Sequence, residues 1–167
     1  MVVNGLYKID IKYYHDFPNE NHIQLKSGRP FYYAIQDNRG VFWLVPLSTQ
    51  VANYKDKISK VEQKRGKGKC LIYHIGIVTG QEMVFRICDM IPVTEEYIAG
   101  EFVKYGKHYV IQQESLIKEL TRKSRDYIKQ LEIGRMHSRM GGVSIREKLL
   151  ELINGSKCGE GKNKGEK

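Results

Sequence analysis

The stretch FYYAIQDNRGVFWLVPLST, which runs from Phe31 to Thr49, decides the fold. Residues 31–36 and 41–47 are two runs of mostly aromatic and β-branched side chains, the residue types that strands favour. The four residues between them, 37–40, are Asp, Asn, Arg and Gly, a composition typical of a turn. The stretch therefore predicts a β-hairpin.

A helix is predicted directly after the hairpin. Apolar residues in 51–61 recur at spacings of three and four positions, which is the helical period. Ser48 or Thr49 is a natural N-cap for this helix, because a side-chain hydroxyl can accept from the first free backbone N–H groups. The helix is expected to end in the basic, glycine-containing stretch 65–69.

Shorter patterns place the other elements around these two. Upstream, a strand over 4–9 is followed by a short helix that Asp10 caps, and then by a polar loop over 18–29. Downstream, we expect strands over 70–78, 83–88 and 91–93, a short helix and loop over 94–108, a strand over 109–111, and helices over 114–133 and 144–153. This order predicts an α+β fold, a compact and strongly bent antiparallel sheet with peripheral helices.

The length and composition indicate one domain. The chain has 167 residues, of which 41% are hydrophobic, and we expect 1–153 to form the domain and the polar residues 154–167 to be a disordered tail. No apolar run approaches the roughly 20 residues of a membrane helix, and no secretory signal is visible. Three cysteines without a CxxC pair suggest a reducing compartment, so we expect a cytoplasmic protein with no membrane association.

The positive charge is concentrated in two predicted helical regions. The formal net charge is +9; residues 50–69 carry seven Lys and Arg against two Asp and Glu, and residues 118–148 carry nine against four. Clustered basic residues are the electrostatic footprint of a nucleic-acid-binding protein. A solvated surface, or a subunit whose basic patches bind acidic proteins, is the alternative interpretation.

The sequence lacks the common catalytic motifs. It has no GxxxxGK[ST] loop, no HExxH pair and no GxSxG elbow, and its aspartates form no cluster suited to two metal ions. We therefore expect no metal and no cofactor. A nuclease of this kind would cut RNA, whose 2′-hydroxyl supplies the nucleophile internally.

RNA cleavage needs cations for the phosphoryl oxygens and groups that move protons. Arg29 and Ser48 flank the hairpin, so a simple register places them at the same end. Arginine can grip two phosphate oxygens, and the hydroxyls of Ser48 and Thr49 can donate to phosphate or relay protons. Lys55 and Lys57 follow about two helical turns later, with side chains long enough to reach back.

Several short blocks, taken in order, resemble a known family. The blocks are Tyr7-Lys-Ile, Lys12-Tyr13-Tyr14, Asp16-Phe17-Pro18, Arg29-Pro-Phe-Tyr-Tyr-Ala, Phe42-Trp-Leu-Val-Pro-Leu-Ser48-Thr49 and Asp89-Met-Ile-Pro-Val-Thr94. Together they resemble the endoribonucleases of type III toxin–antitoxin systems, the ToxN/AbiQ family, and above all its CptN branch. The resemblance spans about residues 5–133.

This resemblance implies a bent, barrel-like core of the MazF/Kid type with added helices. It implies a metal-independent endoribonuclease that leaves 2′,3′-cyclic phosphate and 5′-hydroxyl ends on cellular mRNA. The family also cuts its own repeated antitoxin RNA, whose processed repeats fold as pseudoknots and inhibit the toxin in a closed protein–RNA assembly. No direct protein partner is required. Members act in phage defence by abortive infection or in plasmid maintenance.

Four positions carry over from the family pattern. Ser48 and Thr49 match its hydroxyl pair, Arg29 matches a position that is often lysine, and Tyr13 matches an N-terminal tyrosine. A guanidinium stays protonated, so Arg29 is assigned to phosphate binding and the general base is left open.

One position departs from the family pattern. Some members have a lysine two residues beyond the second hydroxyl, where this chain has Val51. Lys55 and Lys57 are the nearest replacements. We expect Lys55 to be the catalytic lysine, with Lys57 as an RNA contact and as the other candidate for the catalytic role.

A wider RNA interface is expected on the basic segments and on exposed aromatic rings, because phosphates bind cations and unpaired bases stack on rings. The candidate RNA-binding residues are Lys12, Tyr13, Tyr54, Lys57, Lys64, Arg65, Lys67, Lys69, Arg122 and Lys123. Core packing is the alternative for each tyrosine and is favoured for Tyr54. The alternative function is a non-catalytic RNA-binding module of the same fold.

Overall fold

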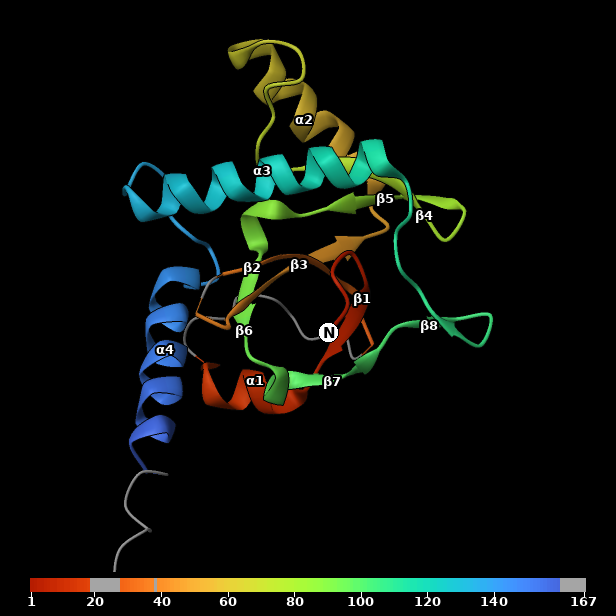
Figure 1. Cartoon of the computed structure of the whole chain (residues 1–167). Helices are drawn as coiled ribbons and strands as arrows, with labels where there is room; N and C mark the ends of the chain where they lie inside the picture. Colours follow the sequence, from red (N-terminus) through yellow and green to blue (C-terminus); the bar gives the residue numbers. More distant parts are fainter. Residues whose placement is uncertain (19–27, 38, 160–167) are drawn as a thin grey trace, which may run out of the picture.

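The structure, a computed structural model, describes residues 1–18, 28–37 and 39–159, with side chains through residue 155. Its elements in chain order are β1 (Leu6–Ile9), α1 (Ile11–Asp16), β2 (Phe31–Gln36), β3 (Phe42–Ser48), α2 (Val51–Arg65), β4 (His74–Val78), β5 (Gln81–Phe85), β6 (Ile91–Val93), β7 (Ile98–Glu101), β8 (Val103–Lys104), β9 (Lys107–His108), α3 (Glu114–Glu132) and α4 (Gly142–Gly159). Short 3-10 helices, η2 (Ile87–Asp89) and η3 (Glu95–Tyr97), lie on either side of β6. The α+β prediction is confirmed (Figure 1).

The predicted hairpin is the pair β2–β3. Its register runs from Phe31 opposite Pro46 to Gln36 opposite Phe42, with one irregularity between Tyr33 and Ile35. At the turn, Asp37 Oδ1 accepts hydrogen bonds from the backbone N–H groups of Arg39 (2.8 Å) and Val41 (3.2 Å). The side chain of a turn aspartate thus replaces backbone partners, as its residue type predicts.

The far edge of β3 has two partners in succession. Residues Phe42–Leu44 pair with β6, and Leu47 and Ser48 pair with β5. Pro46 lies at the fork between the two partners, where its carbonyl accepts a hydrogen bond from Arg86 N (3.0 Å). A proline fits here because the ladder is interrupted on this edge.

The sheet is antiparallel and open. Its strand order is β4-β5-β3-β2-β1-β7, with β6 attached to β3, and within the described residues the outer strands β4 and β7 do not pair with each other. The predicted bent antiparallel core is therefore confirmed, but the sheet does not close into a barrel.

Both faces of the central hairpin are buried. Alternate residues of β2 and β3, such as Tyr32 and Trp43, belong to a cluster that includes side chains of α2 and α3. The intervening residues, such as Tyr33 and Leu44, belong to a second cluster with α1 and α4. In Figure 1, α2 and α3 accordingly lie on the opposite side of the sheet from α1. This explains why all seven residues of β3 are buried.

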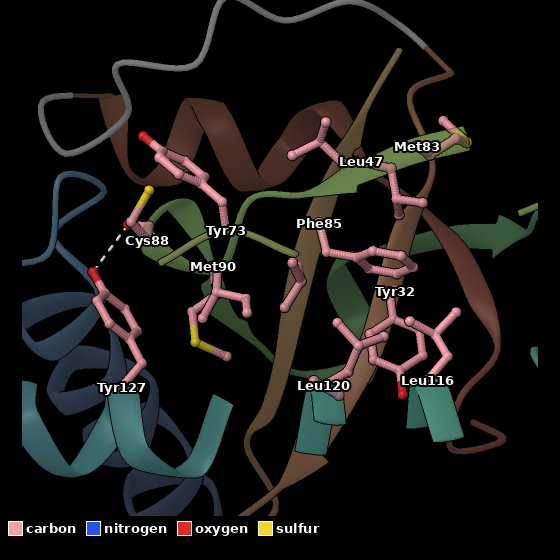
Figure 2. Close-up of a cluster of buried hydrophobic side chains, with 14 of the residues drawn as sticks. Tyr32, Leu47, Tyr73, Met83, Phe85, Cys88, Met90, Leu116, Leu120 and Tyr127 are labelled. Atoms are coloured by element: carbon pink, nitrogen blue, oxygen red, sulfur yellow. Dashed lines mark hydrogen bonds between the residues drawn. The ribbon is translucent and has the colours of Figure 1, made fainter. Parts of the chain in front are cut away.

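Figure 2 shows the cluster under α3. The rings of Tyr32 and Phe85 meet edge to face with centroids 5.5 Å apart, beside Leu116 and Leu120 of α3. Farther along α3, Tyr127 Oη donates to the carbonyl oxygen of Cys88 (3.0 Å). The apolar face predicted for this helix is thus the face that packs on the sheet.

Several sequence predictions need correction. Residues 86–88, expected as strand, contain the start of η2, and 94–108, expected as a short helix and loop, also contain β7, β8 and β9. The strand expected over 109–111 is only an isolated bridge between Gly5 and Val110. In each case a local pattern was too short to reveal the pairing partner.

The ends of the helices also differ in part from the predictions. Asp10 caps α1 as predicted, accepting from Lys12 N (2.8 Å). The tail was expected to start at residue 154, but α4 continues to Gly159, so that prediction is wrong for 154–159. Residues 160–167 and most of the loop predicted over 18–29 lie outside the described residues. No helix in the described part is long and apolar enough to cross a membrane.

The packing of α3 makes a direct prediction. Leu120 is fully buried, so Leu120→Ala should lower the free energy of unfolding by about 2–5 kcal/mol through the cavity it leaves. Urea denaturation followed by circular dichroism measures this. Lys118→Ala, on the exposed side of the same helix, should change it by less than about 0.5 kcal/mol. Equal effects of the two substitutions would contradict the assigned packing face.

Candidate functional site

The candidate site lies where β3 ends. Ser48 is the last residue of β3, pairs with Val84 of β5 and is 8% exposed. Thr49, the next residue, is exposed. The two hydroxyls therefore differ in access: Thr49 faces solvent, and Ser48 is almost enclosed.

The prediction that Ser48 or Thr49 caps the following helix is wrong. The N-cap of α2 is Gln50, and no side chain makes the capping hydrogen bond. Ser48 Oγ instead accepts from the backbone N–H of Gln50 (3.3 Å), which lies before the helix. The serine hydroxyl thus shapes the strand-to-helix turn.

Arg29 lies at the same end of the hairpin, as its spacing from Ser48 predicts. The hydrogen bond from Leu47 N to Pro30 O (3.2 Å) continues the β2–β3 register past Phe31, which brings Arg29 level with Ser48. Arg29 is half-buried, and its charge acts on Tyr14. Burial raises the pKa of Tyr14 to about 12, and the nearby guanidinium opposes this shift.

The structure adds Arg86, which sequence reasoning missed. Arg86 N donates to Pro46 O, so Arg86 stands two residues beyond Val84, the partner of Ser48, and lies diagonal to Ser48. Diagonal neighbours in an antiparallel pair lie within about 7–8 Å. No motif marks this residue, because its place depends on how β3 changes partners.

A buried carboxylate holds Arg86 in place. Asp89, 1% exposed, forms an ion pair with Arg86, and its other oxygen faces Arg139 Nε at 3.7 Å. The guanidinium also lies 5.8 Å from the ring centre of Tyr54. Arg86 is therefore a preoriented cation beside the strand end.

The two predicted lysines of α2 have internal partners. Lys55 Nζ forms an ion pair with Glu82 of β5 at 2.9 Å, and both side chains are about half exposed. Lys57 Nζ lies 4.6 Å from the ring centre of Tyr54. Exposed pairs of this kind are weak, so a phosphate can compete for either lysine.

A basic cleft lies beside the C-terminal end of α2 and along α3. Its volume is about 780 Å³, and its lining includes Arg65, Lys69, Arg122 and Arg135 together with Asp126. The structure thus brings together three of the predicted RNA-binding residues, and it adds Arg135. Arg122 is oriented by Glu119 (2.6 Å) and Asp126 (3.3 Å), and the first of these raises the pKa of the guanidinium.

The remaining predicted lysines lie apart from this cleft. Lys64 lines an adjoining hollow of about 270 Å³, and Lys67 lines another of about 420 Å³ together with Lys55. Lys12 lies on α1, where it pairs with Glu96 at 3.3 Å, and Figure 1 places α1 at the opposite end of the molecule from α2.

Two predicted base-stacking tyrosines are core residues. Tyr13 is fully buried and packs edge to face on Tyr97 with centroids 5.4 Å apart. Tyr54 is 6% exposed and packs against Tyr73 at 4.9 Å. The prediction that these rings stack on RNA bases is therefore wrong, because no base can reach the ring faces in this packing.

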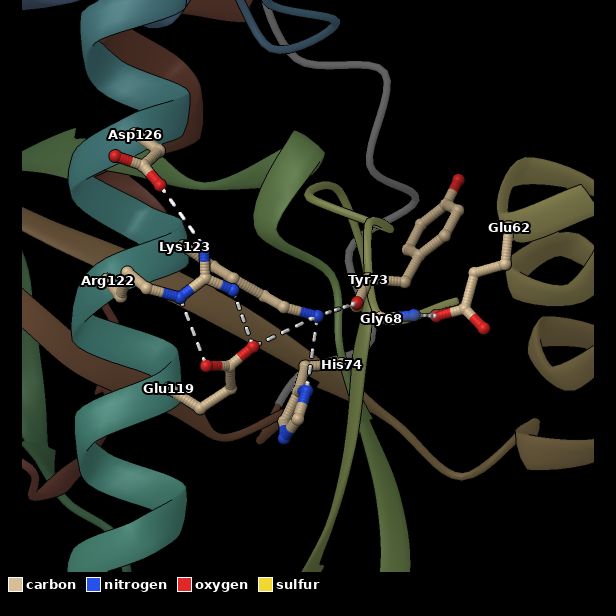
Figure 3. Close-up of polar contacts among 8 residues, drawn as sticks. All are labelled: Glu62, Gly68, Tyr73, His74, Glu119, Arg122, Lys123 and Asp126. Atoms are coloured by element: carbon tan, nitrogen blue, oxygen red, sulfur yellow. Dashed lines mark hydrogen bonds and ion pairs between the residues drawn. The ribbon is translucent and has the colours of Figure 1, made fainter. Parts of the chain in front are cut away.

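Lys123, predicted to bind RNA, is also buried (Figure 3). Its ammonium donates to Tyr73 O (3.2 Å) and contacts His74 Nδ1 (3.3 Å), with Glu119 Oε1 3.8 Å away. The helical charge pattern did not reveal this, because Lys123 lies on the face of α3 that packs on the sheet. Lys123 therefore joins α3 to β4 and offers no charge to a phosphate.

Their surroundings lower the pKa values of both Lys123 and His74. Burial lowers the pKa of Lys123, and Glu119 opposes that shift. Burial lowers the pKa of His74 to about 4, and the positive charge of Lys123 contributes in the same direction. His74 is therefore neutral at pH 7 and accepts a hydrogen bond from the lysine.

Among the described residues, no group of three His, Cys, Asp or Glu side chains is arranged to hold a metal ion. The chemical groups gathered at the strand end are guanidinium and hydroxyl groups. Such groups bind and stabilise anions, above all phosphate.

This fold is shared with a solved toxin–antitoxin endoribonuclease. That structure is AbiQ, a lactococcal anti-phage endoribonuclease belonging to the type III toxin–antitoxin system. The likeness has a TM-score of 0.58 and 12% sequence identity, and it covers 77% of this chain and 82% of AbiQ. No protein-family model and no curated protein matches the sequence. At this identity, the likeness shows that the two chains have the same fold.

The low pKa of His74 predicts a pH dependence of stability. A histidine in the unfolded chain titrates near pH 6.5, so between about pH 6.5 and 4 the unfolded state binds a proton that the folded state does not. Stability should therefore fall as the pH is lowered through this window. Thermal unfolding at a series of pH values should show a shallower fall for His74→Asn than for the unsubstituted protein.

His137→Asn provides the matched control, because His137 is exposed. It should keep the pH profile of the unsubstituted protein. If the His74 and His137 variants have the same profile, His74 does not carry this dependence.

Proposed function

We propose that this protein is an endoribonuclease toxin of a type III toxin–antitoxin system. The observation that carries the proposal is the gathering of Arg29, Arg86, Ser48 and Thr49 at one end of the β2–β3 hairpin, in a fold shared with AbiQ. Two cations and two hydroxyls at one strand end suit a reaction at a phosphodiester.

The reaction is an internal phosphoryl transfer. The RNA 2′-oxygen forms a bond to the adjacent phosphorus, the bond from phosphorus to the 5′-oxygen breaks, and the proton of the 2′-hydroxyl is balanced by one delivered to the leaving 5′-oxygen. The products are a 2′,3′-cyclic phosphate and a 5′-hydroxyl. Because the nucleophile belongs to the RNA, this route needs no metal-activated water.

The residues of the site have separate tasks in this reaction. Arg29 and Arg86 stabilise the negative charge that develops on the phosphoryl oxygens. Thr49, which is exposed, donates to the phosphate or relays a proton. Lys55 is the catalytic lysine candidate once it leaves Glu82, and Lys57 is the other candidate. The general base is not assigned.

The proposed partner and substrate are both RNA. The protein cleaves cellular mRNA and its own repeated antitoxin RNA, and a processed antitoxin pseudoknot inhibits it in a closed assembly. The cleft lined by Arg65, Lys69, Arg122 and Arg135 supports this proposal, because it offers several cations to a phosphate backbone. AbiQ is an anti-phage protein, and we propose a role in phage defence by abortive infection in the cytoplasm here.

A non-catalytic RNA-binding module is the second candidate. Ser48 is 8% exposed and already holds the backbone of Gln50, an arrangement that a purely structural serine would also show. Cleavage separates the two candidates, because both bind RNA and only the first cuts it.

The cleavage test uses a mixed RNA pool in EDTA. The unsubstituted protein should cut it and leave 5′-hydroxyl ends, and the double variant Ser48→Ala, Thr49→Ala should lose about 10²-fold or more in rate. Ser59→Ala, on the exposed face of α2, should cut normally. If the unsubstituted protein binds RNA without cutting it, with or without added Mg²⁺, the binding-module candidate replaces the enzyme.

The salt dependence of binding tests the cleft. In the cleavage-deficient double variant, Arg65→Gln with Lys69→Gln should reduce the slope of log Kd against log salt by up to about 1.4, or about 0.7 for each lost phosphate contact. Fluorescence anisotropy with a labelled single-stranded RNA measures it. Lys8→Gln, on β1 at the β7 end of the sheet, should leave the slope unchanged. Equal slopes in all variants would remove the cleft from the RNA interface.

A further inference from the structure

The hairpin β8–β9 ends in an unusual turn. Its two loop residues, Tyr105 and Gly106, both have positive φ values, 54° and 75°. Positive φ at both loop positions is the type I′ pattern, in which Asn-Gly is favoured. A bulky side chain in this conformation is strained, so Tyr105 is costly to the fold.

A second hairpin in the same molecule provides the comparison. The β4–β5 turn is Thr79-Gly80, again with positive φ values, 55° and 84°. There the strained backbone is fixed by tertiary contacts: Thr79 N donates to Tyr109 Oη (2.9 Å), and Thr79 O accepts from Lys104 Nζ (2.7 Å). The fold itself therefore explains the conformation of Thr79.

Within the described residues, no comparable tertiary contact holds Tyr105. Its side chain is 92% exposed, and among the described residues its ring contacts only Lys104 Nζ, 5.3 Å from the ring centre. The ring contributes nothing to either core cluster. A strained, exposed aromatic residue at a hairpin tip is better explained by an external partner than by the fold.

The β8–β9 hairpin that carries Tyr105 is anchored to the rest of the protein. At its base, His108 Nε2 lies 3.0 Å from Leu6 O, and the imidazole packs on the ring of Tyr7 at 4.9 Å. Along its side, Lys104 ties it to Thr79 at the tip of the β4–β5 hairpin. Figure 1 shows these two hairpins projecting from the same side of the molecule.

The chemistry around the tip indicates the partner. Lys104 and Lys107 flank Tyr105 in the hairpin, and the ammonium of Lys104 lies 5.3 Å from the ring centre. Aromatic rings beside basic side chains bind unpaired nucleotides, because the ring stacks on the base while the cations attract the backbone.

The tip of the β4–β5 hairpin, to which the β8–β9 hairpin is bonded through Lys104, is within reach of an RNA bound at the candidate site. Thr79 and Val84, the partner of Ser48, are five positions apart in the β4–β5 hairpin, which is about 17 Å along a strand. An RNA strand held at Ser48 therefore needs only a few nucleotides to reach Thr79, whose carbonyl accepts from Lys104, the neighbour of Tyr105.

We propose that Tyr105 is an RNA contact, whose ring stacks on an unpaired base of the RNA bound by this protein. The proposal rests on the proposed function, since it takes RNA as the partner. It adds a contact outside both the strand-end site and the cleft beside α3.

The test is the substitution Tyr105→Asn in the Ser48→Ala, Thr49→Ala background. Asn-Gly is favoured in this turn, so the melting temperature should rise by about 2–4 °C. Affinity for a labelled 12-nucleotide single-stranded RNA of mixed sequence should fall about five- to tenfold. Affinity for a fully paired RNA duplex of the same length should change less than twofold, because its bases are already stacked.

Thr79→Asn is the matched control. It makes the same change in the β4–β5 turn, so it should also raise the melting temperature while both RNA affinities stay unchanged. Tyr105→Phe, which keeps the ring, should bind single-stranded RNA like the parent protein.

Other results would overturn the proposal. If Tyr105→Asn binds single-stranded RNA like its parent, Tyr105 is not an RNA contact, whereas the cleavage test with the unsubstituted protein decides the proposed function separately. Equal losses on single-stranded and paired RNA would exclude base stacking. Concentration-dependent self-association that Tyr105→Asn abolishes, with unchanged RNA binding, would assign the ring to a protein interface.

Discussion

The complete burial of β3 is the constraint on which the rest of the structure depends. Its side chains alternate between two cores, and helices cover both faces of the sheet. On one edge it pairs with β2 from Phe42 to Pro46, and on the other it pairs first with β6 and then with β5. The change of partner is made at Pro46, which has no N–H to offer a ladder. Because the η2 turn must connect the two partners there, Arg86 and Asp89 are brought to the end of the strand.

The basic residues of the chain fall into two physical classes. Buried cations have fixed partners: Arg86 pairs with Asp89, and Lys123 is held between α3 and β4. Exposed cations such as Arg122 and Lys55 form ion pairs that solvent screens, and such pairs contribute little to stability. The exposed pairs can therefore open for a phosphate at small cost, whereas breaking a buried pair would leave a charge unpaired. Lys123 therefore maintains the structure, whereas the exposed cations are available to the proposed RNA. In the proposed reaction, Arg86 acts on the phosphate while it stays paired with Asp89.

Local chemistry in the sequence predicted much of the fold and less of the site. The β2–β3 hairpin, α3 and the Asp10 cap of α1 follow from patterns within a few residues, and the structure confirms them. Arg29 and Ser48 were placed together correctly, because a hairpin register converts sequence spacing into position. Arg86 and the burial of Lys123 depend on contacts between segments far apart in the chain, and no local pattern records those contacts. The helical residues 154–159 were missed because their polar composition gave no apolar face.

The difference in exposure between the two hydroxyls gives them different tasks in the proposed reaction. Ser48 Oγ accepts the N–H of Gln50, so this hydroxyl fixes the turn that carries the chain from β3 into α2. Thr49 lies on that turn and is exposed, so its hydroxyl is the one that a phosphate can reach without any movement of the protein. The β3 strand bonds to the hairpin partner up to Leu47 and to β5 up to Ser48, and this pairing keeps the turn in place while the proposed substrate binds. In the proposed reaction, the buried serine therefore positions the turn, and the exposed threonine meets the phosphate.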